Sequence, residues 1–149
     1  ITKVVVSMGL KEGAKDKGVI EKNKTQLEII TGQAARICRA KKSIAAFKLR
    51  EGIAIGSRVT LRKQKMYDFL ERLIHIALPR SRDFWGIDRK SFDREGNLTV
   101  GVKEHISFPE ISPEKVRTIF GFEATITTTA KSREEGIELL RLMGFPIKK

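Results

Sequence analysis

The chain has 149 residues, long enough to bury a hydrophobic core without disulfides or metal. Its 30 Lys and Arg residues outnumber its 18 Asp and Glu residues, and the net charge of +12 favours a polyanionic partner, above all nucleic acid. Cys38 is the only cysteine, which excludes an internal disulfide and a thiolate metal site, and no apolar run approaches the about 18 residues of a membrane span.

The first part of the chain predicts a strand, a helix and a second strand. Residues 2–8 place Val4 and Val6 on one side of a strand and Lys3, Val5 and Ser7 on the other. A helix capped by Asp16 follows and ends at Gly32. Its middle is weak because Asn23 and Lys24 are polar, and its apolar side consists of Val19, Ile20, Leu27 and Ile30. Residues 33–40 predict the second strand.

Residues 55–62 form the most informative predicted strand. Ile55, Val59 and Leu61 face one way, whereas Arg58, Thr60 and Arg62 face the other. One face of this strand is therefore apolar and the other cationic. Residues 63–78 predict the clearest helix, ended by Pro79, because apolar residues recur at spacings of three and four: Met66, Phe69, Leu70, Leu73, Ile74, Ala77 and Leu78.

The last part of the chain predicts two strands and two helices. Residues 97–106 and 122–129 alternate as strands, the second with Ala124 and Ile126 inward. Ser112 is placed to cap a short helix, and the capping box of Ser132 and Glu135 begins a final helix that stops at Gly144. This order predicts one α+β domain over residues 1–149, an antiparallel sheet with helices packed on one face and the other face open for RNA.

Positive charge is concentrated between residues 36 and 65. This segment has ten basic residues and one acidic residue, Glu51, so it carries nine of the twelve net positive charges. About five or six phosphate contacts to a duplex would give a log-log salt slope near −5. Ser7, Gln33 and Thr60 would add hydrogen bonds to bases, sugars or phosphates on the same face as Arg58 and Arg62.

Catalytic and cofactor patterns are missing from the sequence. Gly13 and Gly18 have the spacing of a phosphate-binding loop, but Val and Ile follow where that loop requires Lys and Ser or Thr. His75 and His105 have neither a metal-binding partner nor a nucleophile at a readable spacing. We therefore predict no enzyme, no catalytic residue, no metal and no cofactor.

Several long motifs together resemble one family. They are AKKSIAAFKLREG at 40–52, VTLR at 59–62, MYDFL at 66–70, ALPRSRDF at 77–84, SFD at 91–93, FPEI at 108–111 and TTAK at 128–131. In collinear order, these are similar to the bacterial-type ribosomal protein family "large subunit five", whose members bind 5S ribosomal RNA in the central protuberance. The resemblance implies a noncatalytic scaffold of the large ribosomal subunit.

The resemblance also implies binding residues. The family's 5S contacts fall on Lys3, Ser7, Gln33 and Thr60, where Ser7 departs from the usual asparagine, and charge adds Arg58 and Arg62. The family contacts 23S ribosomal RNA and a small-subunit protein across the subunit bridge. Charge and motif position assign other ribosomal RNA contacts to Lys41, Lys42, Lys48 and Arg50.

In the family, the segment after the long helix projects toward the transfer RNA in the peptidyl site. Loop 79–86 would therefore contact transfer RNA through Arg80 and Arg82. Trp85 replaces a common arginine and has three open roles: it stacks on a nucleotide, contacts a neighbouring protein, or folds back under its own loop.

Two other functions and two questions of origin stay open. A general single-stranded nucleic-acid protein would need several exposed aromatics on the sheet, and an RNA-modifying enzyme would need a nucleophile or cofactor pattern. The chain begins at Ile1, and the family has a helical segment before the first strand, so we expect either a missing N-terminal piece or an unusual N-terminus. The source is a bacterium or an organelle, and residues 126–130 and Ala45–Ala46 resemble plastid members.

Overall fold

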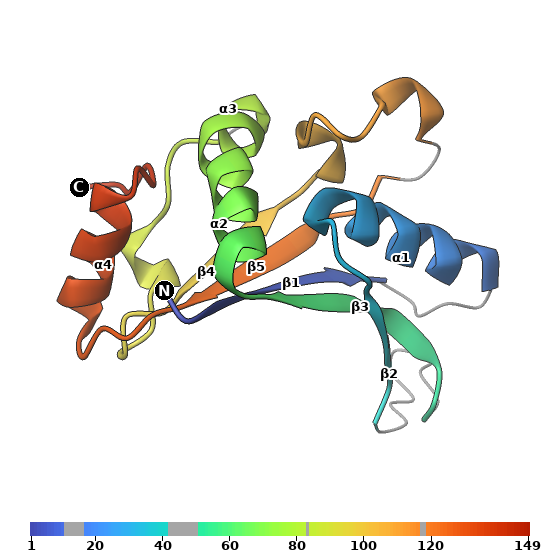
Figure 1. The fold of residues 1–149 in the computed structure, drawn as a ribbon, viewed down its shortest axis with the longest axis horizontal. Coiled ribbons are helices and arrows are strands. Elements are labelled where there is room, and N and C mark those ends of the chain that lie inside the picture. Colours follow the sequence, from blue (N-terminus) through green and yellow to red (C-terminus); the bar gives the residue numbers. More distant parts are fainter. Residues whose placement is uncertain (11–16, 42–50, 83, 117–118) are drawn as a thin grey trace.

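Five strands form one antiparallel sheet in a computed structural model that describes residues 1–10, 17–41, 51–82, 84–116 and 119–149. The strands follow the order β2-β3-β1-β5-β4 across the sheet (Figure 1). Their bounds are β1 Lys3–Gly9, β2 Arg36–Arg39, β3 Ala54–Leu61, β4 Leu98–Val102 and β5 Phe122–Thr127. The predicted α+β fold is confirmed, and β2, β4 and β5 are shorter than the alternation alone indicates.

The helices lie along one face of this sheet (Figure 1). They are α1 Lys17–Thr31, α2 Lys63–Arg72, the π-helical η2 Leu73–Ala77, α3 Leu78–Arg80 and α4 Arg133–Leu142. Short 3-10 turns occupy η3 Arg89–Ser91, η4 His105–Ser107 and η5 Pro113–Lys115. The opposite face of the sheet carries no described helix.

The core lies between the helices and the inward side of the strands. Pairing aligns the buried side chains in rows across the sheet, such as Leu61, Val4, Ile126 and Leu98. All seven apolar positions predicted for the long helix are buried, as are Ile20, Leu27 and Ile30 of α1. The strand and helix periods in the sequence therefore predicted correctly which apolar faces pack together in the core.

The long helix does not end at Pro79. It passes from α2 through the π turn η2 and continues to Arg80, with Pro79 inside α3. A proline inside a regular α-helix loses a hydrogen bond and its ring clashes with the carbonyl four residues earlier. Here the Leu78 amide donates to the Leu73 carbonyl, five residues back, so the wider π turn makes room just before the proline ring.

Two polar residues are buried in ways that the sequence did not predict, and one predicted cap is not made. Asn23 is fully buried and accepts a hydrogen bond from the Ser57 hydroxyl, so it joins α1 to β3. Ser112 precedes a 3-10 turn but makes no side-chain cap. His105 is also fully buried, and its Nδ1 accepts from the Phe120 amide at 3.0 Å. The predicted cap at Asp16 lies outside the described residues.

The Asp93 turn and its neighbours hold α4 against the sheet. Asp93 accepts from the Asn97 backbone amide at 2.8 Å, and Asn97 Oδ1 accepts from the Thr128 amide at 2.9 Å. The hydrogen bond from the Asn97 backbone amide leads the interactions that lower the pKa of Asp93. Gly96, in the same turn, lies so close to Gly136 of α4 that a side chain at Gly136 would overlap the Gly96 backbone. Residues of the motifs at 91–93 and 128–131 therefore help to stabilise the fold.

The final helix has the predicted cap with one change. The Ser132 hydroxyl accepts from the Glu135 amide at 3.3 Å, as in a capping box. The Glu135 carboxylate accepts from the amide of Lys131, not from that of Ser132. The helix ends before Gly144, whose φ of +106° is suited to glycine.

Candidate nucleic-acid interface

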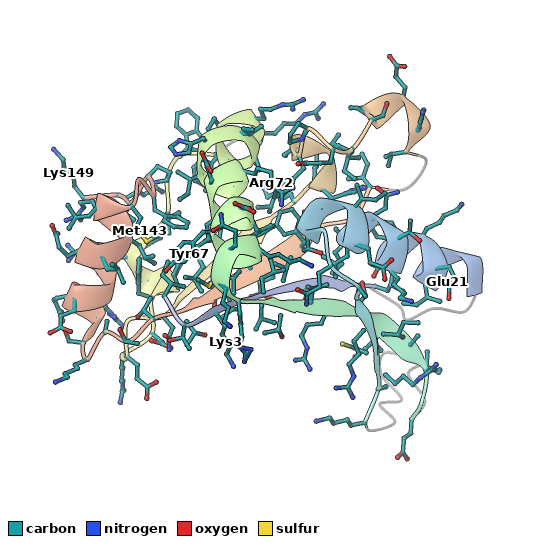
Figure 2. The ribbon with its side chains drawn as sticks, viewed as in Figure 1. Lys3, Glu21, Tyr67, Arg72, Met143 and Lys149 are labelled. Atoms are coloured by element: carbon teal, nitrogen blue, oxygen red, sulfur yellow. The ribbon has the colours of Figure 1, made fainter. Side chains whose placement is uncertain are left out.

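Strand register brings the predicted binding residues into rows on the open face. One row runs Arg36, Arg58, Ser7, Glu123 and Gly101, and the next runs Thr60, Val5, Thr125 and Thr99. Lys3 pairs with Thr127, and Figure 2 shows its side chain on the side of the sheet away from the helices. Lys3 and Arg62 each come directly next to Val4 and Leu61, the last pair of β1 and β3.

The cations of this face are accessible. Arg36, Arg58 and Arg62 are exposed, while Lys3, Ser7 and Thr60 are half-buried. Among the described ion pairs, none involves these cations, and the nearest acidic group by register, Glu123, lies two strands from Arg58. Positive charge therefore gathers over β2, β3 and the start of β1, whereas the β4 and β5 side is mostly threonine and glycine.

Two arginines face each other directly on adjacent strands. Arg36 of β2 pairs with Arg58 of β3, and both side chains are exposed. Like charges directly opposite each other destabilise a sheet. The free protein thus carries a repulsion that a phosphate placed between the two guanidinium groups would relieve.

Gln33 and Thr60 are brought together although they lie far apart in the sequence. The Gln33 side-chain amide donates to the Thr60 carbonyl at 2.9 Å, from the loop between α1 and β2. Lys65 extends toward the Gly32 carbonyl at 3.5 Å in the same region. Gln33 therefore also supports the edge of the predicted site. Sequence reasoning missed this contact because it joins a loop to a strand 27 residues away.

A hollow with a glycine floor opens at one end of the open face. It measures about 620 Å³, and its walls include Cys38, Lys103 and Glu123. Gly9, Gly56, Gly101 and Gly121 contribute to its lining. At Gly9 and Gly101 an added Cβ would meet nothing within 4 Å, so the floor is open to solvent. The sequence offered one signal for this hollow, the glycines within predicted strands. Such glycines mark places where a ligand or another backbone can approach the strand closely.

The basic segment after β2 is only partly described. Lys41 is exposed next to β2, and Arg39 donates to the Gly52 carbonyl at 3.2 Å. Lys42, Lys48 and Arg50 lie outside the described residues. The interpretation of Lys41, Lys42, Lys48 and Arg50 as RNA contacts stays a prediction.

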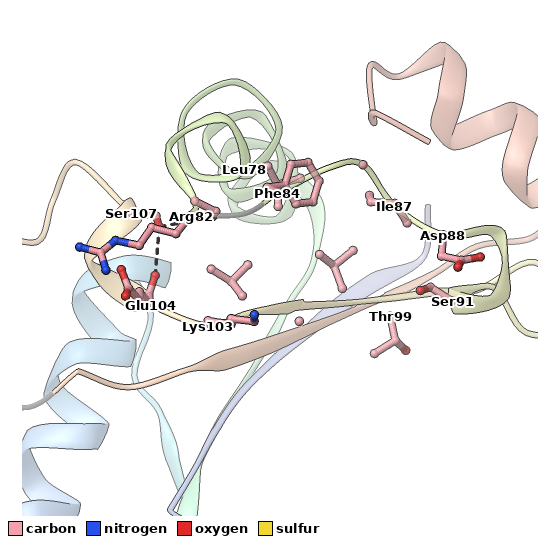
Figure 3. A pocket seen from close by; sticks show the side chains of 15 residues that line it. Leu78, Arg82, Phe84, Ile87, Asp88, Ser91, Thr99, Lys103, Glu104 and Ser107 are labelled. Carbon is pink, nitrogen blue, oxygen red and sulfur yellow. Dashed lines mark hydrogen bonds between the residues drawn. The ribbon is translucent and has the colours of Figure 1, made fainter. Parts of the chain in front are cut away.

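The loop with Arg80 and Arg82 starts on the helix side of the molecule. Both arginines are exposed, and α3 lies far from the open sheet face (Figure 1). Arg82 stands at one end of a cavity of about 450 Å³ between this loop and β4, with Phe84 and Ile87 along it (Figure 3). The two sets of predicted contacts therefore occupy different surfaces.

Trp85 is 82% exposed, the highest exposed fraction among the described large apolar side chains. The interpretation that it folds back under its own loop is wrong. Ile87, two residues later, is the buried residue of this segment, with 5% exposed.

Three other properties of the described residues bear on function: metal binding, the pKa of a buried histidine and the ability to cross a membrane. Across these residues, His, Cys, Asp and Glu side chains form no group of three that could hold a metal ion. Burial lowers the pKa of His105. None of the helices found in the described ranges combines the length and the apolar character needed to cross a bilayer.

Comparison with known proteins confirms the resemblance seen in the sequence. Residues 54–147 match the model of the C-terminus of the ribosomal protein L5 family, and residues 1–50 match the model described as ribosomal protein L5. The chain is 54% identical to large ribosomal subunit protein uL5 of Desulfotalea psychrophila, over all of the chain and 83% of the relative. It is 53% identical, over 99% of the chain and 83% of each relative, to uL5 of Prochlorococcus marinus and uL5c of Paulinella chromatophora.

Proposed function

The chain belongs to the ribosomal protein L5 family, and from that premise we propose that its open sheet face binds 5S ribosomal RNA. Family membership makes it a structural protein of the large ribosomal subunit with a role in translation, and not an enzyme. Bacterial and plastid forms both occur among its relatives. What we propose is which surface of the protein binds which RNA.

One observation carries the proposal: accessible cations, without an ion pair among the described residues, on a sheet face that no described helix covers. Arg36 and Arg58 stand opposite each other at the β2 end of a row across the sheet, and Ser7 follows in the same row. Phosphates would lie over β2 and β3, where each contact releases a condensed counterion. The glycine-floored hollow beside them would admit the sugar-phosphate backbone closely.

The contacts are assigned to two groups on this face. Charged contacts come from Lys3, Arg58 and Arg62, and hydrogen bonds come from Ser7, Gln33 and Thr60. Ser7 is shorter than an amide side chain, so its contact would be lost or bridged by water. The Thr60 hydroxyl lies in a row with Val5 and Thr125, from which it can reach a ribose or phosphate oxygen.

Further partners are proposed for the other surfaces. Lys41, Lys42, Lys48 and Arg50 would contact 23S-type ribosomal RNA, and Arg80, Arg82 and Trp85 would contact the transfer RNA of the peptidyl site. A small-subunit protein would meet this chain across the subunit bridge. We also infer that residues 1–149 fold as one unit, because β1 lies between β3 and β5.

A general single-stranded nucleic-acid protein fits less well. Such proteins stack successive bases on aromatic side chains of the binding face. Among the described strands, the only aromatic is Phe122, and it is buried on the core side. Binding through charge and shape therefore suits this face better than binding through stacking.

Competition at fixed salt tests the proposal. The purified protein is mixed with labelled 5S ribosomal RNA, and an unrelated hairpin of equal length is added as competitor. Preference for 5S RNA over the hairpin is the expected result. Equal competition by the two RNAs would identify a nonspecific polyanion binder and refute the assignment.

A further inference from the structure

Trp85 is exposed on a segment that the fold holds in place. Ile87 is buried two residues later, and its amide donates to the Pro146 carbonyl at 2.7 Å. The Lys148 amide in turn donates to the Ile87 carbonyl at 2.9 Å. A short parallel bridge between Ile87 and Ile147 thus ties the loop to the C-terminal segment. The indole is therefore presented to solvent by anchored backbone.

A hollow lies beside the indole. It measures about 420 Å³, within the range of sites that take small planar groups, and Trp85 forms one wall. Phe84, Pro146 and Lys148 complete its lining, with Gly86 and Ile147. A side chain at Gly86 would come within 3.2 Å of the Pro146 carbonyl oxygen, so glycine keeps the hollow open.

Basic residues are close to this hollow in the sequence. Lys148 lines it and is exposed, as are Lys149 next to it and Arg89 and Lys90 just after the loop. Among the described carboxylates, the nearest in the sequence is Asp88, which accepts from the Lys90 amide at 2.9 Å. Lysines are depleted in the centres of protein interfaces, whereas an aromatic face flanked by cations suits a base with its phosphates.

We propose that Trp85 stacks on an unpaired base of RNA, and that Lys148 contacts the phosphate next to that base. The site is separate from the open sheet face, and it rests on the proposed function only in that RNA is the partner. The shared chemistry is an unpaired nucleotide, which ribosomal RNA and transfer RNA can each supply.

Fluorescence of the intact protein tests this directly, because Trp85 is the only tryptophan. The probes are an unstructured oligoribonucleotide of about 12 nucleotides, a fully paired RNA duplex of the same composition, 5S ribosomal RNA and transfer RNA. Stacking should quench the emission with the single strand and leave it nearly unchanged with the duplex. Comparison of the last two RNAs identifies the natural source.

Variants separate stacking from simple apolar contact. W85A should weaken binding of the single strand about 5-fold to 150-fold, W85F should retain most of the affinity, and W85L should behave like W85A. L142A is the matched control, because Leu142 is 77% exposed, does not line the hollow and should change nothing. K148A should weaken binding and reduce its salt dependence.

Three outcomes would overturn the proposal. Base stacking would be excluded by equal quenching with duplex and single strand, by unchanged affinity of W85A for the single strand, or by full affinity of W85L. A change of emission caused by ribosomal proteins but by no RNA would assign Trp85 to a protein contact. Quenching should persist in the double variant R58A and R62A, because Trp85 is unchanged in it. This variant therefore separates a failure of the sheet-face proposal from a failure of the proposal for Trp85.

Discussion

Replacing Arg58 by Gln should affect RNA affinity and protein stability in opposite directions. Arg36 lies directly opposite on β2, and the described ion pairs include neither arginine. If the two guanidinium groups lie about 6–8 Å apart in water, their repulsion is about 0.5–0.7 kcal/mol before salt screening. Removing the charge should raise the free energy of unfolding by up to that amount at low salt.

The same substitution should weaken RNA binding through one lost phosphate contact. The slope of log affinity against log salt should become shallower by about 0.7–0.9, the contribution expected for each neutralised phosphate. Affinity is measured by filter binding of 5S ribosomal RNA at several salt concentrations. Stability is measured by urea denaturation of the free protein in the same buffers.

R141Q is the matched control. Arg141 is exposed on α4 and pairs with Glu138 at 3.1 Å, so this variant lowers the net charge equally without touching the sheet. An equal change of slope in R58Q and R141Q would show that overall charge, not the open face, binds RNA. Loss of stability in R58Q would refute the argument from opposed arginines.

Four further predictions concern other parts of the molecule. T60V should weaken 5S RNA binding by about 1–3 kcal/mol, measured by filter binding, with an unchanged melting temperature. The double variant R80A and R82A should lower affinity for transfer RNA in a gel-shift assay and leave 5S binding nearly intact. G136A should lower the free energy of unfolding by about 1–3 kcal/mol or more in urea denaturation, because its Cβ would lie 2.3 Å from the Gly96 carbonyl oxygen. Stability should fall as pH drops below about 6.5, since His105 is neutral in the folded state and charges more readily when unfolded.

Three of these predictions have a comparison variant in the chain. Q33A is expected to weaken 5S binding but also loses a hydrogen bond to the Thr60 carbonyl, so it reports on stability and binding together. G101A should leave stability unchanged, because its Cβ meets nothing within 4 Å. H105N should flatten the fall in stability below pH about 6.5. An unchanged pH dependence in H105N would contradict the assignment to His105.

Local patterns in the sequence were enough to predict the layers of the fold. Alternation in residues 98–102 and 122–127 and the spacing of apolar residues in 63–78 predicted the buried faces, because burial on one side imposes a period on the chain. The open face followed, since Arg58 and Thr60 had to point away from the apolar side. The family motifs added the expected partners of that face.

Features that depend on tertiary pairing could not be predicted in this way. The opposition of Arg36 and Arg58 is set by the register of β2 against β3, which no local pattern specifies. The burial of His105 depends on Phe120, fifteen residues away. The π turn before Pro79 resolves a conflict between an apolar period that continues and a residue that normally ends a helix. Exposure of Trp85 likewise follows from Ile87 taking the core position.

The position of β1 in the middle of the sheet bears on how the protein is made. Both of its neighbours, β3 and β5, come later in the chain, and β5 is separated from it by roughly a hundred residues. At about 5–20 residues per second, the first strand would wait roughly 5–20 s during synthesis for its second neighbour. Throughout that delay a half-made, strongly basic polypeptide would emerge beside cellular RNA, so a chaperone that shields nascent chains should raise its yield.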